Sequence, residues 1–290
     1  MTGNDTRKGI ILMSLTMLIF ASQDGISRYL ADEYNVILVV MIRYWFFALF
    51  VLTISARMAG SIRKAAATTQ PKLQIFRGLL LAAEVCVMVL AFTLLGLIES
   101  MAIFASYPLM VAALSGPVLG EKVGPYRWLA IGIGMVGVLI ILKPGFGVFS
   151  PYALIAVVSS AMFALYSLLT RYAARKDTAA TSFFWTGVAG AVGMTFGGVW
   201  FWEPMAPTDY IWMLALCITG AGGHFLLIKT YEVAEASAVQ PFAYLQLVFV
   251  SIIGMTVFGE TLAANVAIGA ALVIAAGVFT ALRERRLARK

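Results

Sequence analysis

Four ionisable side chains lie deep within apolar segments of this 290-residue chain, namely Asp24, Arg43, Glu84 and His224. A charge at the centre of a bilayer costs about 2.5–3.5 kcal/mol on insertion scales, so such residues are retained for a partner or for a function. Asp24 and Arg43 lie on either side of one short connection and can pair with each other. Alternatively, Asp24 pairs with Arg28 one turn along the same helix, or it binds a substrate or a proton directly.

Glu84 and His224 differ from this pair because neither has an obvious partner nearby in sequence. Arg77 lies two turns away from Glu84, so Glu84 is our first candidate for a group that titrates or contacts a substrate ammonium; the alternative is a hydrogen-bonded contact between helices. His224 is the only histidine and follows Gly220, Gly222 and Gly223. A histidine titrates near physiological pH, which favours proton coupling, although a packed and satisfied histidine explains it equally well.

The sequence contains its own duplicate. One helix face recurs after 143 residues: Thr16, Phe20, Gln23, Ser27, Arg28, Tyr29 and Ala31 return as Ser159, Phe163, Tyr166, Thr170, Arg171, Tyr172 and Ala174. A second face recurs after 137 residues: Thr93, Ser100, Tyr107 and Val111 return as Thr230, Ser237, Tyr244 and Val248. Internal repeats in apolar segments are typical of secondary transporters, whose site lies between the repeats.

The second duplicated face predicts two polar and aromatic stripes on helices. One stripe consists of Ser100, Phe104, Tyr107, Val111 and Ser115, and the other of Ser237, Pro241, Tyr244, Val248 and Ser251. Pro108 and Pro241 would free backbone carbonyls, which is tolerated where they line a cavity. The alternative is that the aromatic stripes only pack helices together. Together with the deep ionisable groups, the duplicated faces predict a pocket formed by Phe20, Gln23, Asp24, Arg43, Glu84, Phe104, Tyr107, Phe163, Tyr166, His224 and Tyr244.

Composition sets the fold class. Hydrophobic residues make up 61% of the chain and charged residues 12%, against about 25% charged in soluble proteins. We therefore predict an all-α integral membrane protein with ten transmembrane helices at residues 9–30, 36–58, 74–96, 99–119, 125–142, 152–174, 180–202, 208–231, 237–258 and 264–282. Five helices per half is an odd number, so residues 1–147 and 148–290 would form two inverted repeats around a central cavity.

Charge predicts the orientation. Most of the 21 Lys and Arg residues lie in the two ends of the chain and in the connections that this topology places on the same side. The positive-inside rule then puts both termini in the cytoplasm of a bacterial-type inner membrane. Cys86 and Cys217 are expected to be packing residues. The glycines of the fifth and tenth helices are expected to allow close packing, with dimer formation as the alternative to a monomer. Gly120-Glu121 and Gly259-Glu260 resemble helix-ending glycines followed by solvated acids.

These features together resemble the drug/metabolite transporter superfamily in its EamA-type branch. The resemblance covers roughly residues 8–282 and depends on the doubled halves, the Pro108 region, the two Gly-Glu pairs and the glycine-rich helices. Within that branch the chain is similar to YddG-type amino-acid exporters. The resemblance implies inverted five-helix repeats, a central cavity, alternating access and an acid beside the cavity at the place of Glu84.

The expected function is secondary transport of small metabolites, with amino-acid export first. Uptake or efflux of S-adenosylmethionine, a nucleoside, a drug or another cation is the alternative, and an intramembrane enzyme or a receptor-like binding protein represents a different class. Glu84 with His224 is the only acid-base pair that such an enzyme would offer. We find no phosphate-binding loop or cluster of metal ligands in the sequence, so we expect no cofactor, no metal, no nucleic-acid partner and no enzymatic activity.

Overall fold

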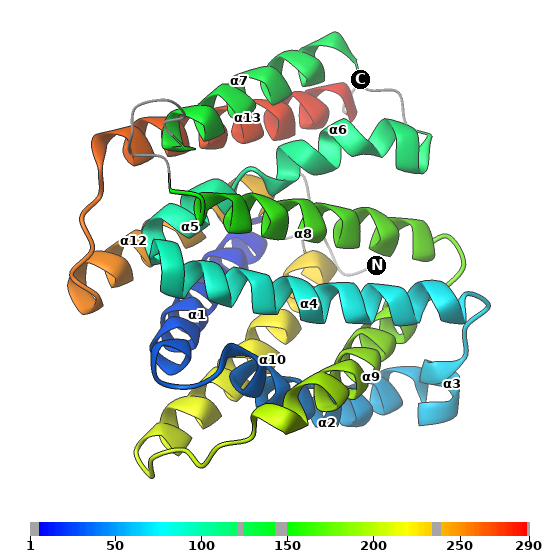
Figure 1. The fold of residues 1–290 in the computed structure, drawn as a ribbon. Coiled ribbons are helices and arrows are strands. Elements are labelled where there is room, and N and C mark those ends of the chain that lie inside the picture. Colours follow the sequence, from blue (N-terminus) through cyan, green and yellow to red (C-terminus); the bar gives the residue numbers. More distant parts are fainter. Residues whose placement is uncertain (1–5, 121–123, 143–149, 234–238, 289–290) are drawn as a thin grey trace.

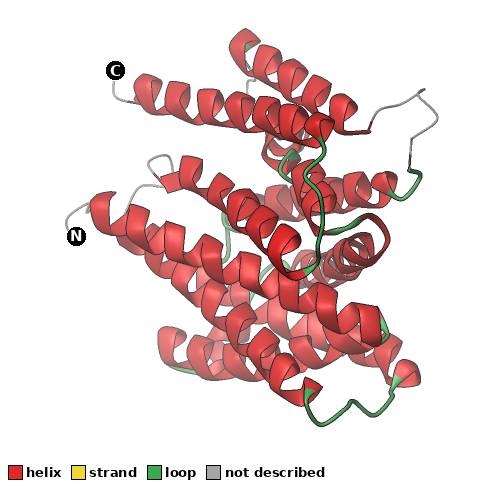
Figure 2. Ribbon diagram, turned by 90° about the vertical axis from the view of Figure 1, so that its left-hand side faces the viewer, coloured by secondary structure: helices red, strands yellow, loops and turns green. Residues whose placement is uncertain are grey.

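The computed structural model describes residues 6–120, 124–142, 150–233 and 239–288, and the secondary structure of these residues is entirely helical (Figures 1 and 2). The first half contains α1 (Thr6–Glu33), α2 (Val36–Ala59), α3 (Ile62–Ala66), α4 (Pro71–Leu95), α5 (Leu97–Phe104), α6 (Tyr107–Leu119) and α7 (Pro125–Leu142). The second half contains α8 (Ala153–Ala173), α9 (Ala179–Gly198), the 3₁₀ helix η1 (Val199–Phe201), α10 (Asp209–Val233), the 3₁₀ helix η2 (Gln240–Tyr244), α12 (Leu245–Val257) and α13 (Ala264–Ala288).

Local capping explains several of these boundaries. Asn35 begins α2 by accepting a hydrogen bond from the Ile37 N–H, and Thr178 begins α9 by accepting one from the Thr181 N–H. Pro71 stands in the first turn of α4, where its missing N–H costs nothing. Gly120 ends α6 in the left-handed conformation, as the sequence indicates. Most helices therefore begin and end within a few residues of the expected positions.

The fourth and ninth predicted helices are wrong as continuous α-helices. The segment 99–119 is divided into α5 and α6 at Ala105 and Ser106, with Pro108 in the first turn of α6. In the segment 237–258, Pro241 lies at the start of η2, which leads into α12. A proline cannot donate a backbone hydrogen bond, so Pro108 and Pro241 each stand in the first turn of the new helix, where an N–H has no intrahelical partner.

The described helices have the length and composition of membrane spans. Six segments are long and apolar enough to cross a bilayer: Arg7–Glu33, Val36–Ile54, Pro71–Leu95, Leu97–Val118, Ala153–Ala173 and Asp209–Leu227. Three shorter apolar helices are Trp128–Leu142, Phe242–Val257 and Ala264–Thr280. α9 belongs to neither group because glycine, serine and threonine lower its hydropathy. The chain is thus a multi-pass membrane protein, and ten spans remain a prediction.

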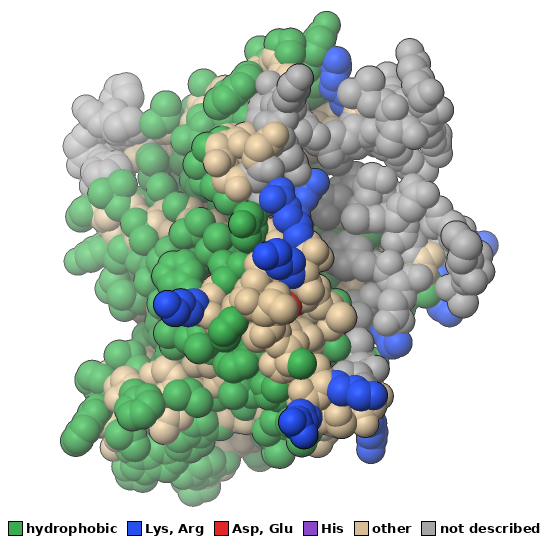
Figure 3. All heavy atoms as spheres, turned by 90° about the vertical axis from the view of Figure 1, so that its right-hand side faces the viewer, with side chains coloured by type: hydrophobic (Ala, Val, Ile, Leu, Met, Phe, Trp, Pro, Cys, Tyr) green, Lys and Arg blue, Asp and Glu red, His purple; other side chains and the backbone are tan. Residues whose placement is uncertain are grey.

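The surface agrees with this assignment. Large hydrophobic side chains such as Ile11, Leu49, Phe196 and Ile211 are exposed on the outside of the bundle, where lipid would cover them. Lys and Arg side chains lie on the face shown in Figure 3, among hydrophobic and other side chains. Basic residues at an end of the helices are what topogenic anchors require.

Helices of the two halves pack against each other in a reciprocal way. α1 packs on α10, and α4 on α8, while α2 contacts α9 and α7 contacts α13; α4 and α8 are seen side by side in Figure 1. A Cβ atom built on Gly137 would lie 2.7 Å from the Gly269 carbonyl oxygen, so the backbones of α7 and α13 touch. Close packing is confirmed for these two glycines. Gly132, in contrast, faces open space.

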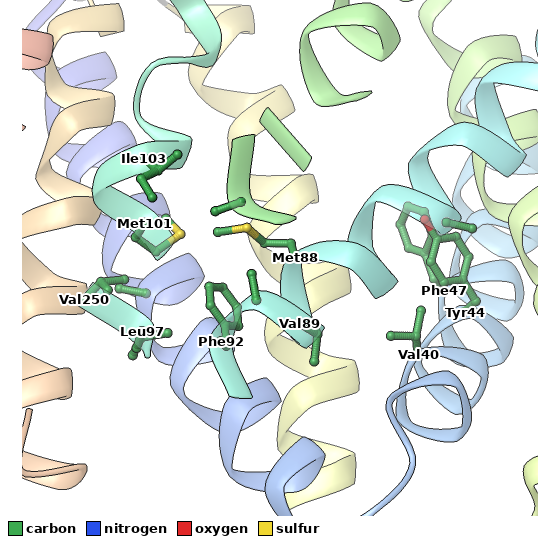
Figure 4. Close-up of a cluster of buried hydrophobic side chains, with 14 of the residues drawn as sticks. Val40, Tyr44, Phe47, Met88, Val89, Phe92, Leu97, Met101, Ile103 and Val250 are labelled. Carbon is green, nitrogen blue, oxygen red and sulfur yellow. The ribbon is translucent and has the colours of Figure 1, made fainter. Parts of the chain in front are cut away.

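The largest hydrophobic cluster joins α2, α4, α5 and α12 (Figure 4). Tyr44 and Phe47 come from α2, Met88 and Phe92 from α4, and Met101 from α5. These same five residues also line the cavity described below. The core therefore fixes the wall of the cavity directly.

Candidate functional site

A cavity of about 270 Å³ lies between the two halves and is lined by residues of α1, α2, α4, α5, α6, α8, α10, η2, α12 and α13. This volume is near the lower end of the range of about 300–1,000 Å³ for small-molecule sites. The structure brings together in its lining all but one of the residues expected from the sequence: Phe20, Gln23, Asp24, Arg43, Glu84, Phe104, Tyr107, Phe163, His224 and Tyr244. Their role in binding remains a prediction.

Aromatic rings form much of the wall. The Phe163 ring centroid lies 4.8 Å from that of Tyr107 and 5.3 Å from that of Phe104, and Phe104 lies 5.2 Å from Tyr107. On the opposite helices, the His224 ring lies 5.2 Å from Phe20 and 5.7 Å from Phe47. The three rings from α5, α6 and α8 offer flat faces and edges to a planar ligand group.

Two carboxylates face the same space and each has a neutral partner. Gln246 Nε2 donates to Asp24 Oδ2 at 2.7 Å, and Ser159 Oγ donates to Glu84 Oε1 at 2.7 Å. Glu84 is only 3% exposed. Neutral hydrogen-bond donors orient these carboxylates without neutralising them, so both acids can still attract a cation.

The arginine of the cavity is not paired with either acid. Among the described residues Arg43 makes no hydrogen bond and no close ion pair, although it lines the cavity together with Asp24. Neither pairing alternative for Asp24 is therefore formed among the described residues: Arg43 makes no close ion pair with it, and Arg28 instead forms an ion pair with Glu260 and lies 3.8 Å from Asp32. The guanidinium of Arg43 is thus a donor available to a ligand.

Gln23 adds an acceptor to the site. Its buried Oε1 has no hydrogen-bond partner in the described part of the chain. A Cβ atom built on Gly220 would lie 3.2 Å from both Gln23 Oε1 and Arg43 Nε, so a larger residue at this position would press on both side chains. The glycine of α10 accordingly leaves room for the polar groups of α1 and α2.

Tyr166 is the one predicted site residue that the cavity does not include. Its hydroxyl accepts a hydrogen bond from Arg77 Nη2 at 3.4 Å, and the Arg77 guanidinium lies 5.1 Å from its ring centroid. Arg77 is 1% exposed and also bonds Thr170 Oγ1 and Gln74. The buried guanidinium holds Tyr166 away from the cavity.

The predicted stripes line the cavity only in part. Phe104, Tyr107 and Tyr244 do so, but the Ser100 hydroxyl donates to the Ala91 carbonyl and Val248 is 49% exposed. Ser237 lies outside the described residues.

Two partners of the cavity acids were not singled out from the sequence. Gln246 lines the cavity but lies off the predicted stripe. Ser159 bonds Glu84 without lining the cavity and was identified only as the counterpart of Thr16 in the repeat. A polar residue in an apolar segment was the available signal for Gln246. Cys217 is buried and lines the cavity, whereas the Cys86 sulfur lies 3.8 Å from that of Met194, as expected for packing.

Comparison with known proteins identifies the family. The sequence pattern of the EamA-like transporter family matches this chain twice, at residues 7–143 and 150–282. The chain belongs to the EamA-like transporter family. The two matches together cover nearly the whole chain. They confirm the resemblance to the EamA-type branch of the drug/metabolite transporter superfamily.

Relatives of this chain carry two kinds of name. An S-adenosylmethionine uptake transporter of Rickettsia bellii (strain RML369-C) is 27% identical over 281 residues, which is 96% of this EamA-like transporter and 94% of the relative. A riboflavin transporter of Brucella anthropi is 29% identical over 248 residues, 83% of this chain and 87% of the relative. A solved crystal structure shares the fold, with a TM-score of 0.63 at 17% sequence identity. The match covers 97% of this chain and 99% of the chain in that structure.

Proposed function

We propose that this EamA-like transporter carries an adenosylated amino-acid cation of the S-adenosylmethionine type. The observation that carries the proposal is the presence of two carboxylates, one guanidinium and three clustered aromatic rings in a single cavity. S-adenosylmethionine has a sulfonium, an ammonium, a carboxylate and a purine. Relatives named for its uptake, aligned over 96% of the chain, support the same assignment.

Each part of this ligand has a complementary group in the cavity. Asp24 and Glu84 attract the sulfonium and the ammonium, because opposite charges interact strongly away from bulk water. Arg43 offers a planar fork for the carboxylate. The rings of Phe104, Tyr107 and Phe163 pack against the purine, since every base has a π-face.

This proposal replaces the expectation of amino-acid export. A simple amino acid uses the charged groups but leaves the aromatic wall without a function, and the relatives aligned over most of the chain carry the names of uptake and riboflavin transporters. We therefore propose uptake. The second candidate is riboflavin, which the aromatic rings and the unpartnered Oε1 of Gln23 favour. Riboflavin is neutral, however, and does not explain why two acids are kept at this depth.

We further propose that residues 1–147 and 148–290 are inverted repeats of five spans each. The reciprocal contacts of α1 with α10 and of α4 with α8 support it, as does the double family match. Inverted repeats supply two near-equivalent conformations and hence alternating access. Both termini would lie in the cytoplasm at a bacterial plasma membrane, and one chain suffices as a monomer because one chain lines the cavity.

Transport without chemical change is the proposed outcome of binding. Glu84 and His224 both line the cavity, but no hydrogen bond joins them among the described residues: Glu84 bonds Ser159 and the His224 ring contacts Phe20 and Phe47. An acid-base pair for catalysis needs hydrogen-bond contact, directly or through one water. The intramembrane enzyme is therefore the weaker alternative.

A comparison of two ligands tests the charge argument. S-adenosylhomocysteine retains the purine and the amino acid but has a neutral thioether in place of the sulfonium. The transporter should prefer S-adenosylmethionine. Of Glu84→Gln and Asp24→Asn, the variant that removes the acid at the sulfonium should lower this preference by about five- to tenfold, the effect of a lost ion contact of about 1–1.4 kcal/mol. The variant that removes the acid at the ammonium should weaken binding of both ligands alike. Asp32→Asn removes an acid outside the cavity and should leave the preference unchanged. Equal competition by both ligands in the unmodified protein would contradict the proposal.

A further inference from the structure

Glu260 connects three segments of the chain through a single carboxylate. Its Oε1 accepts the Leu97 N–H at 2.7 Å and its Oε2 accepts the Ile98 N–H at 2.8 Å, so it caps the first turn of α5. It also forms an ion pair with Arg28 of α1. The acid itself follows α12. We refer to Glu260, Arg28 and the N–H groups of Leu97 and Ile98 as the Glu260 latch.

The residues around the latch enclose Glu260 and Arg28 closely. The Glu260 and Arg28 side chains are only 15% and 16% exposed, which corrects the sequence-based expectation of a solvated acid. Gly96 has φ +99°, and a Cβ atom there would lie 3.1 Å from Glu260 Oε1, so glycine serves both the turn and the close approach. The Arg28 guanidinium lies 4.3 Å from the Phe258 ring centroid. An enclosed pair of this kind is strongly destabilised when one partner is removed.

The latch lies directly beyond one end of the cavity. Asp24 and Ser27 of α1 line the cavity, and Arg28 is the next residue. Gln246 and Leu247 of α12 line it from the second half. Since Arg28 and Leu97 belong to the first half and Glu260 to the second, the contact holds the two halves together at this end.

We propose that the Glu260 latch closes this end of the cavity and must open whenever the carrier exposes its cavity there. The proposal rests on the proposed alternating access. With the orientation that the charges predict, this end faces the outside. In the sequence, Arg171 and Glu121 are the duplicates of Arg28 and Glu260, so an inverted carrier has the same two residue types at its opposite end; Glu121 lies outside the described residues.

Accessibility of single cysteines tests the latch without any substrate. In a chain with Cys86→Ala and Cys217→Ala, Ser27→Cys reports on the latch end and Leu227→Cys on the other end of the cavity. Glu260→Gln should raise the rate at which an impermeant thiol reagent labels Ser27→Cys in intact cells by about tenfold, because it shifts the population toward the outward-open state. In inverted vesicles, labelling of Leu227→Cys should fall.

A matched control is available at the same end. Glu203 Oε1 also accepts a backbone N–H, that of Asn35 at 2.9 Å, but its segment does not line the cavity, so Glu203→Gln should change neither rate. Unchanged labelling of Ser27→Cys in Glu260→Gln protein that elutes normally on gel filtration overturns the proposal, and so does a rise at both reporter sites, which indicates general loosening.

A second variant covers a failure of Glu260→Gln to fold. Arg28→Gln leaves the cap on α5 intact and removes the ion pair with Glu260, together with the Arg28 contacts to Phe258 and Asp32, so it should give the same reciprocal change with a smaller amplitude. No change in either rate for a folded Arg28→Gln protein overturns the latch. Loss of S-adenosylmethionine flux, by contrast, rejects only the proposed substrate, because the labelling assay contains none.

Discussion

Removal of the Phe163 ring should weaken binding of a purine-bearing ligand far more than binding of a plain amino acid. Phe163 contacts Tyr107 at 4.8 Å edge-to-face and Phe104 at 5.3 Å, so it is central to the aromatic wall. A base stacked on an aromatic side chain contributes about 1–3 kcal/mol by alanine substitution. For Phe163→Ala this predicts a 5- to 150-fold increase in KM for S-adenosylmethionine, by the equivalence of about 1–3 kcal/mol with that factor.

The assay is competition against labelled S-adenosylmethionine uptake, with unlabelled S-adenosylmethionine and methionine as competitors. Methionine has no ring to stack, so it should compete more weakly than S-adenosylmethionine, and the concentration of methionine needed for half-inhibition should change little in Phe163→Ala. Phe196→Ala removes the same ring from a position that is 78% exposed outside the cavity, and it should leave both values unchanged. A folded Phe163→Ala protein with an unaltered KM, or with equal losses for both competitors, would refute the assigned role of the aromatic wall.

Three further predictions address topology, helix packing and the predicted external surface. When single cysteines are placed at positions 2, 145 and 288 of a cysteine-free chain, an impermeant reagent should label only the cysteine at position 145 in intact cells. Labelling at position 2 or 288, with position 145 protected, contradicts cytoplasmic termini. Gly137→Leu should lower the thermal unfolding temperature, because a Cβ atom at this position would lie only 2.7 Å from the Gly269 carbonyl oxygen and overpacking costs about 1–3 kcal/mol or more. Gly132 faces open space, so Gly132→Leu should be tolerated. The Tyr34 hydroxyl donates to Asp209 at 2.7 Å, and this hydrogen bond raises the pKa of Tyr34 in the folded protein. The hydrogen bond therefore contributes fully to stability below the pKa of an unfolded tyrosine, about 10, and this contribution is lost as the pH rises through the pKa of Tyr34 in the folded protein. The Tm difference between the unmodified protein and Tyr34→Phe should therefore be constant between about pH 6 and 9 and shrink above that range, and a difference that persists in strongly alkaline buffer argues against this.

Most of the predicted site residues line the cavity because the two signals that selected them can be read from the sequence without knowledge of tertiary contacts, and their role in binding stays a prediction. An ionisable residue deep in an apolar segment needs no knowledge of its partner to be recognised, and Asp24, Arg43, Glu84 and His224 all line the cavity. The duplicated faces added Phe20, Phe163, Tyr107 and Tyr244 for the same reason. Helix positions followed from apolar runs and from capping residues.

The missed features depend on contacts between distant parts of the chain. Glu260 looked like a solvated acid after a helix, since nothing near it in sequence reveals Arg28 or the N–H groups of α5. Tyr166 is the duplicate of Gln23, but the symmetry fails there because Arg77 of α4 binds the tyrosine, while the corresponding position of α10 is Leu214. The helix breaks depended on how Pro108 and Pro241 are accommodated by their neighbours.

Flux through the purified protein tests the central claim most directly. Proteoliposomes preloaded with unlabelled ligand should be compared with empty liposomes for exchange of labelled S-adenosylmethionine, riboflavin, and neutral and aromatic amino acids, with chromatography of the recovered label. We predict rapid exchange of chemically unchanged S-adenosylmethionine that unlabelled S-adenosylmethionine suppresses. No exchange of S-adenosylmethionine in a preparation that carries riboflavin or amino acids rapidly would contradict the proposed substrate.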